Sequence, residues 1–192
     1  MDLYHPHPAT TLARHLLAAA LLTTPLLANR PYTSEGALIT ESFDSLAASP
    51  LPTTGFPSSP LVAGAPAWSN GTTAQGWHFS SDSGNTPANY LPSIGAFSAQ
   101  NIAVSAGATA STDRALGSQS ANLSATPSRL GWRIRNNSGT TLHQFTLTYT
   151  GEQWRVLQND LPDGYSFDWQ VFPANSGSLT SPTGWTAAPA LN

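Results

Sequence analysis

The strongest constraint on the fold is a period-two alternation of apolar and polar side chains in the second half of the chain. It recurs in three stretches, 129–136, 142–150 and 165–172. This period places one set of side chains on a buried face of a sheet and the other set toward solvent. The apolar set is rich in Trp, Phe, Tyr and Val, which are favoured in strands. The pattern therefore predicts three successive antiparallel strands.

Turn residues separate these stretches. Asn and Gly at 136–139 tolerate positive φ, and Pro-Asp-Gly at 162–164 is a typical turn sequence. Proline-rich residues 47–67 are expected to form a loop. Weaker strand candidates are 37–43, 76–80, 101–105 and 184–187. Together these features predict an all-β, jelly-roll-like antiparallel β-sandwich.

An apolar run precedes this region. Residues 15–28 read HLLAAALLTTPLLA and follow Arg14. The run is shorter than the roughly 20 residues needed to span a bilayer, so it indicates a signal peptide that directs export. We assign 1–36 to this leader helix, with cleavage after Ala28 or near Gly36, and 37–192 to the sandwich domain. The alternative is an amphipathic helix that packs on the mature protein.

Charge and cysteine content narrow the function classes. The chain has 192 residues, seven Arg, no Lys, ten acidic residues and a net charge of −3. Nucleic-acid binding needs a concentrated basic surface, so this partner class is disfavoured. The absence of cysteine excludes disulfides, thiolate metal sites and cysteine nucleophiles.

Several short blocks occur in a recognisable order. They are ESFDSL at 41–46, GW at 76–77, TDRALGS at 112–118, NNSG at 136–139, YTGEQWR at 149–155 and FDWQV at 167–171. The series resembles an uncharacterised family of secreted bacterial β-sandwich domains, often associated with PEP-CTERM-type sorting tails. The resemblance implies export and a sandwich fold, without a settled activity. Such domains continue for further strands, so we expect this chain to be truncated at its C-terminus.

One carboxylate pair lies near the predicted strands. Glu152 and Asp168 would suit glycoside hydrolysis, which uses two carboxylates about 5–10 Å apart. Surface ion pairs with Arg133, Arg135 and Arg155 explain the same residues without chemistry. We therefore predict no catalytic site.

Metal ligands are sparse as well. Asn159, Asp160 and Asp163 offer oxygen atoms suited to calcium, but the alternating acidic spacing of a calcium loop is missing and the turn explains Asp163. His78 and His143 stand alone, without the spacing of a zinc motif. We predict no metal site and no cofactor.

Six tryptophans are the remaining signal. Trp132 and Trp169 belong to the alternating apolar sets, so we expect both in the core. Trp154 follows a predicted strand, and its flat face could pack in the core or stack on a sugar ring. With Glu152 and Arg155 it forms the candidate ligand-binding site.

The leading hypothesis is a non-catalytic extracellular or cell-surface module, either glycan-binding or structural, with polysaccharide or cell-surface components as partners. The alternative is a secreted polysaccharide-active hydrolase or its accessory domain. No transmembrane span is expected beyond the signal peptide. Because a sandwich uses about seven strands and only three are strongly predicted, uncovered edges should make the chain aggregation-prone or oligomeric.

Overall fold

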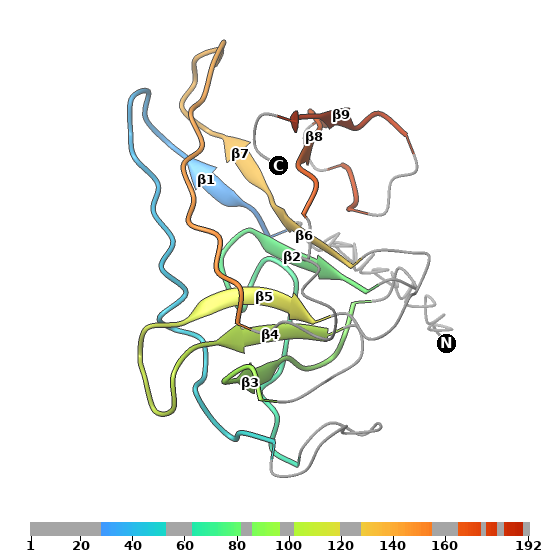
Figure 1. The fold of residues 1–192 in the computed structure, drawn as a ribbon. Coiled ribbons are helices and arrows are strands. Elements are labelled where there is room, and N and C mark those ends of the chain that lie inside the picture. Colours follow the sequence, from blue (N-terminus) through green and yellow to red (C-terminus); the bar gives the residue numbers. More distant parts are fainter. Residues whose placement is uncertain are drawn as a thin grey trace, which may run out of the picture.

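The computed structural model describes residues 28–52, 63–81, 86–96, 102–119, 128–154, 165–173, 176–179 and 183–189. Within these residues the chain is all-β, with short strands and no α-helix (Figure 1). The strands form small sheets of two or three members. The all-β part of the predicted fold class is therefore confirmed. Residues 1–27 of the predicted leader, which was assigned to 1–36, lie outside the described part.

The largest of these sheets contains β3 (Leu91–Ser93), β4 (Ile102–Ala106) and β5 (Ala115–Gln119). β4 lies in the centre, parallel to β3 and antiparallel to β5. All residues of β4 are buried, which fits a short apolar strand with a neighbour on each side. Its side chains Ile102 and Val104 pack with Leu91 of β3 in one apolar cluster.

A second sheet pairs β2 (Trp77–Ser80) with β6 (Arg129–Trp132) in antiparallel register. Trp77 lies directly opposite Trp132, and their rings stack with centroids 5.7 Å apart and planes inclined by 11°. Phe79 of β2 is fully buried. It belongs to the main core cluster, whose other buried members are Leu46, Trp68, Tyr90 and Ala103.

A third sheet pairs β1 (Arg30–Tyr32) with β7 (Ile134–Asn136) in parallel register. The backbone N–H of Arg30 donates to the carbonyl of Arg133 at 2.8 Å, and Asn137 N–H donates to the Tyr32 carbonyl at 2.7 Å. β1 lies inside the stretch that the sequence analysis assigned to the leader. In this structure the paired part of the chain begins upstream of residue 37.

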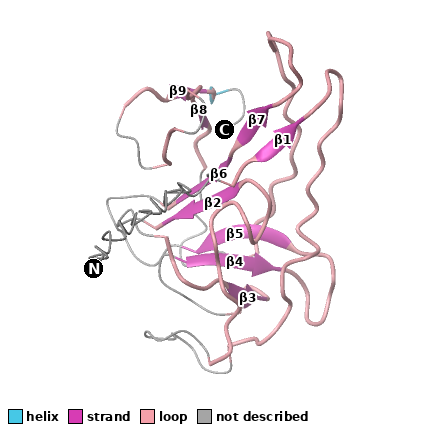
Figure 2. Cartoon of the chain, turned by 180° about the vertical axis from the view of Figure 1, so that it is seen from behind, coloured by secondary structure: helices cyan, strands magenta, loops and turns pink. Residues whose placement is uncertain are grey.

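The first alternating stretch forms two strands, β6 and β7, with Arg133 between them. The prediction of a strand at 142–150 is wrong, because the structure gives this segment an irregular course (Figure 2). Its side chains are mostly solvent-exposed, and Phe145 is 70% exposed. Alternation shows that a segment suits a half-buried sheet position, but it does not supply a neighbouring strand.

The third stretch, 165–172, contains only β8 (Asp168–Trp169), which pairs with β9 (Thr186–Ala187). β9 lies within the weaker candidate at 184–187. The weaker candidates at 76–80 and 101–105 correspond to β2 and β4, whereas 37–43 forms no strand.

One arginine is buried at the end of the three-stranded sheet. Arg114 is 3% exposed, and its guanidinium donates to Ser105 Oγ at 2.9 Å, to the Ser93 carbonyl at 3.2 Å, to the Ala108 carbonyl at 3.3 Å and to the Ser105 carbonyl. These bonds join β3, β4 and the loop that leads into β5. Burial lowers the pKa of Arg114 from its ordinary value. The carbonyl oxygens stabilise its charge where water is excluded.

Candidate ligand-binding site

The candidate site residues Glu152 and Trp154 end an irregular segment that runs from the turn at Gly139 toward β4 (Figure 1). The indole N–H of Trp154 donates to Glu152 Oε2 at 2.8 Å. Two residues of an extended chain lie on the same side, so this contact follows from their spacing. Trp154 is 40% exposed. The third candidate, Arg155, lies outside the described residues.

The backbone of Trp154 packs against a glycine that sequence reasoning missed. Gly95 follows β3 with φ at +78°, and its N–H donates to Ser93 Oγ at 3.1 Å. A Cβ atom at Gly95 would collide with the Trp154 carbonyl oxygen. Glycine is therefore required here by conformation and by space. Since the indole is also hydrogen-bonded to Glu152, Trp154 is held at its backbone and at its ring.

Further aromatic side chains lie on neighbouring segments, where Tyr149 and Tyr165 are exposed and Phe167 is half-buried. Tyr149 stacks on Phe167 with ring centroids 5.1 Å apart and planes inclined by 27°. The Tyr165 hydroxyl lies 3.5 Å from Ser118 Oγ of β5. We call Tyr149, Tyr165 and Phe167 the aromatic ridge. The stack joins the segment that carries Glu152 to the segment that carries β8.

The expectation that Trp169 lies in the core is wrong. Trp169 is 46% exposed on the two-residue strand β8. Trp132 is half-buried and stacks on Trp77. A strand of two residues with a single partner strand leaves a large side chain uncovered, which explains why Trp169 stays in solvent.

Glu152 and Arg133 contact other groups of the described chain. The contact of Glu152 is with Trp154, and Asp168 is exposed on β8. The guanidinium of Arg133 donates to the Gly177 carbonyl at 3.3 Å and lies 6.0 Å from the ring centroid of Phe172. Burial lowers the pKa of Arg133 from its ordinary value.

The described part of the chain holds no group of three or more His, Asp or Glu side chains placed to bind a metal ion. The calcium candidates at 159, 160 and 163 and the turn at 162–164 lie outside it. No helix in that part is long and apolar enough to cross a membrane.

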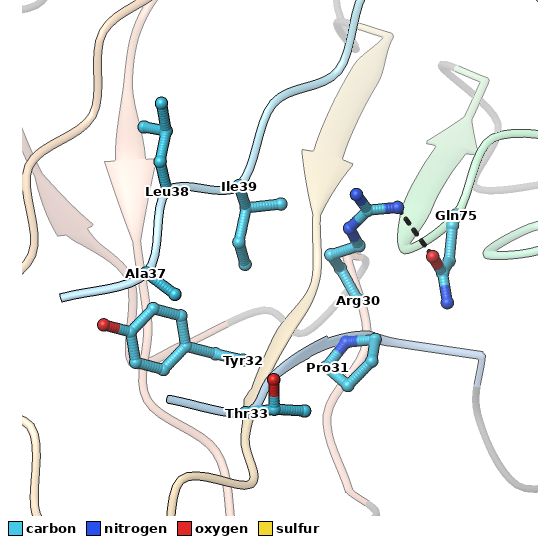
Figure 3. A pocket seen from close by; sticks show the side chains of 8 residues that line it. All are labelled: Arg30, Pro31, Tyr32, Thr33, Ala37, Leu38, Ile39 and Gln75. Atoms are coloured by element: carbon cyan, nitrogen blue, oxygen red, sulfur yellow. Dashed lines mark hydrogen bonds between the residues drawn. The ribbon is translucent and has the colours of Figure 1, made fainter. Parts of the chain in front are cut away.

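A shallow hollow of about 330 Å³ lies beside β1 (Figure 3). Its walls come from 30–33, 37–39 and Gln75. Arg30, the one charged residue that lines it, donates through Nη1 to Gln75 Oε1 at 2.6 Å. This hollow was not predicted, because half of the residues that line it fall within 1–36, the stretch assigned to the leader. The guanidinium of Arg30 is therefore already hydrogen-bonded within the chain.

His78 lies close to the start of the described chain. Its Nε2 is 3.2 Å from the Ala28 carbonyl oxygen. Burial is the main cause that lowers the pKa of His78, and Arg133 adds to it, while the hydrogen bond to Ala28 opposes both. His78 therefore contacts a backbone group and is not part of a metal cluster of the described residues.

Comparison with known proteins found no family model that matches the chain and no significantly similar curated protein or solved structure.

Proposed function

We propose that this chain is a non-catalytic, exported β-sheet module that binds a neutral polysaccharide through Trp154. The observation that carries the proposal is the exposed indole of Trp154, held by Glu152 at 2.8 Å and by the packing of its backbone on Gly95. A ring that is already oriented loses little conformational freedom when a ligand stacks on it.

The chemistry of the site suits a sugar. The face of an indole is electron-rich and attracts the polarised C–H groups on one side of a pyranose. One carboxylate oxygen of Glu152 accepts a hydrogen bond from the indole N–H. The second oxygen can accept a hydrogen bond from a sugar hydroxyl. The aromatic ridge, of which Tyr149 lies three residues before Glu152, offers further flat surface.

Charge favours a neutral ligand over an acidic one. The net charge of the chain is −3, and Glu152 places a carboxylate at the site. A uronate or sulfated sugar would meet repulsion there, whereas a neutral glucan, mannan or chitin would not.

The wider setting is part of the same proposal. The apolar run at 15–28 and the resemblance to secreted β-sandwich domains support export, to the medium or the cell surface. The jelly-roll arrangement rests on that resemblance. Polysaccharides and cell-surface components are the partners to be expected there.

Binding is tested by retention of the purified full-length chain on insoluble cellulose, mannan and chitin, with depletion from the supernatant as the readout. We expect retention of the wild type on at least one of them and about a tenfold loss for Trp154→Ala, which corresponds to about 1.4 kcal/mol. Trp169→Ala is the matched control, because it removes another exposed tryptophan and should leave retention unchanged. Glu152→Gln keeps an acceptor for the indole N–H and should retain binding.

Equal retention of wild type and Trp154→Ala would refute the proposal. Release of reducing sugar by the wild type, lost in both Glu152→Gln and Asp168→Asn, would instead establish the hydrolase alternative.

A further inference from the structure

Residues 142–150 have the side-chain pattern of a strand, and none of the described strands pairs with 142–148. Phe145, Leu147 and Tyr149 alternate with polar residues, and the segment follows an irregular course. None of residues 142–148 forms a backbone hydrogen bond to another described residue. Phe145 is 70% exposed. Such a segment is a template for the backbone of another strand.

We infer that residues 142–150 form the interface of a twofold homodimer, pairing antiparallel with the same segment of a second copy. The choice of occupant rests on charge and on self-complementarity. Residues 136–151 contain no Asp, Glu, Lys or Arg, so two copies meet without like-charge repulsion and no charge selects a different partner. Antiparallel pairing of identical segments closes on a twofold axis.

The side chains fix one register. In an antiparallel pair, directly opposite residues share a face, so the apolar sets coincide only when an odd-numbered residue lies opposite an odd-numbered one. Centring the pair on Leu147 brings Phe145 opposite Tyr149, and Thr146 opposite Thr148. Centring it on Phe145 or on Tyr149 instead places the two other apolar residues of the set opposite polar or glycine residues. Aromatic and Thr–Thr pairs are favourable across strands.

The aromatic ridge supports this register. The ring of Tyr149 already stacks on Phe167, 5.1 Å away between centroids. In the Leu147-centred pair, Phe145 of the second copy lies opposite Tyr149 and extends this stack on both sides of the axis. The most exposed ring of the segment, Phe145, is thereby covered.

The absence of cysteine from the chain allows a direct test with single-cysteine variants of the full-length protein. Opposite residues in such a pair lie within the separation that a disulfide spans. We expect Leu147→Cys to form a disulfide-linked dimer on mild oxidation. Phe145→Cys and Tyr149→Cys should each cross-link poorly alone but cross-link with each other when mixed. Leu38→Cys, at an exposed site far along the sequence, controls for random collision.

Light scattering of the unmodified chain should give twice its 20.1 kDa mass. Thr146→Pro removes one N–H from the proposed pairing and should give a monomer with an unchanged melting transition. A monomeric wild type, an assembly larger than a dimer, or cross-linking of Leu38→Cys equal to that of Leu147→Cys would overturn the inference.

Discussion

Trp77 and Trp132 lie directly opposite each other on β2 and β6, and their rings stack almost in parallel at 5.7 Å. Phe43 meets the Trp77 ring edge-on at 5.0 Å, so Trp77 joins the β2–β6 pair to the 43–47 segment and the main core. The two stacked tryptophans are therefore expected to contribute unequally to stability, because Trp77 also contacts Phe43.

We expect Trp132→Ala to lower the free energy of unfolding by about 2–3 kcal/mol, below the range for a fully buried aromatic because Trp132 is half-buried. Trp77→Ala should cost more, because it also loses the contact with Phe43. The double variant should show a coupling of about 1 kcal/mol. Urea unfolding of the four proteins measures these values, and strictly additive losses would show that the stack contributes nothing.

The burial of Arg114 predicts that replacing it with lysine destabilises the protein more than the same replacement at an exposed arginine. A lysine at this position has one ammonium group and cannot reach the acceptors from Ser93, Ser105 and Ala108 together. We expect Arg114→Lys to lower the free energy of unfolding by about 2–4 kcal/mol, because buried acceptors are left unpaired. Arg129→Lys, at an exposed position of β6, should change it by less than about 0.5 kcal/mol. Equal effects in urea unfolding would contradict the buried role of Arg114.

Sequence reasoning succeeded where an alternating or apolar stretch has a partner strand in the fold. β6 and β7 fall within the strongest alternating stretch, and β2 and β4 fall on weaker candidates. It failed at 142–150, where the pattern is equally regular but no strand of the described chain lies alongside. Pairing depends on distant residues, and local side-chain order does not record it.

Other strands were missed for local reasons. β5 reads ALGSQ and β3 reads LPS, and both are poor in the branched and aromatic residues that mark strands. β1 was not predicted, because it follows an apolar run that resembles a leader. At the site, the spacing of Glu152 and Trp154 could have predicted their contact, whereas Gly95 is far away in the sequence and only the fold brings it to Trp154.

His78 predicts a dependence of stability on pH. Its folded-state pKa is lowered below the ordinary value of about 6.5, so the native state binds fewer protons than the unfolded state. The contribution of neutral His78 to the stability of the folded protein is therefore fully present above about pH 6.5. It is lost as the pH falls toward the folded-state pKa. Arg133 is the charged group whose field acts on it.

We expect His78→Gln to weaken this loss between pH 7 and pH 5, since glutamine keeps a donor for the Ala28 carbonyl and does not titrate. His143→Gln, at an exposed position, should follow the wild-type curve. Urea unfolding at several pH values gives the comparison. Parallel curves for wild type and His78→Gln would show that His78 does not contribute.

The start of the chain gives a further expectation. Gly71 has φ at +75°, and a Cβ atom there would collide with Ala28, so Ala28 packs closely on the 71–76 turn. A chain of residues 28–192 should melt close to the full-length protein. A chain of 37–192 loses β1 and should melt about 5–10 °C lower, which corresponds to a few kcal/mol. If both truncated chains melt alike by circular dichroism, β1 is dispensable.

The pairing of β1 with β7 has a consequence for how the protein reaches its folded state. Arg30 meets Ile134 more than one hundred residues later in the chain, whereas β4 and β5 are joined by a short loop. During synthesis the N-terminal part emerges first, so β1 lacks its partner strand until β7 has been synthesised. Long loops close slowly, and the local β4–β5 hairpin is therefore expected to form early. Until the second half of the chain has been synthesised, β1 therefore remains accessible to chaperones and proteases.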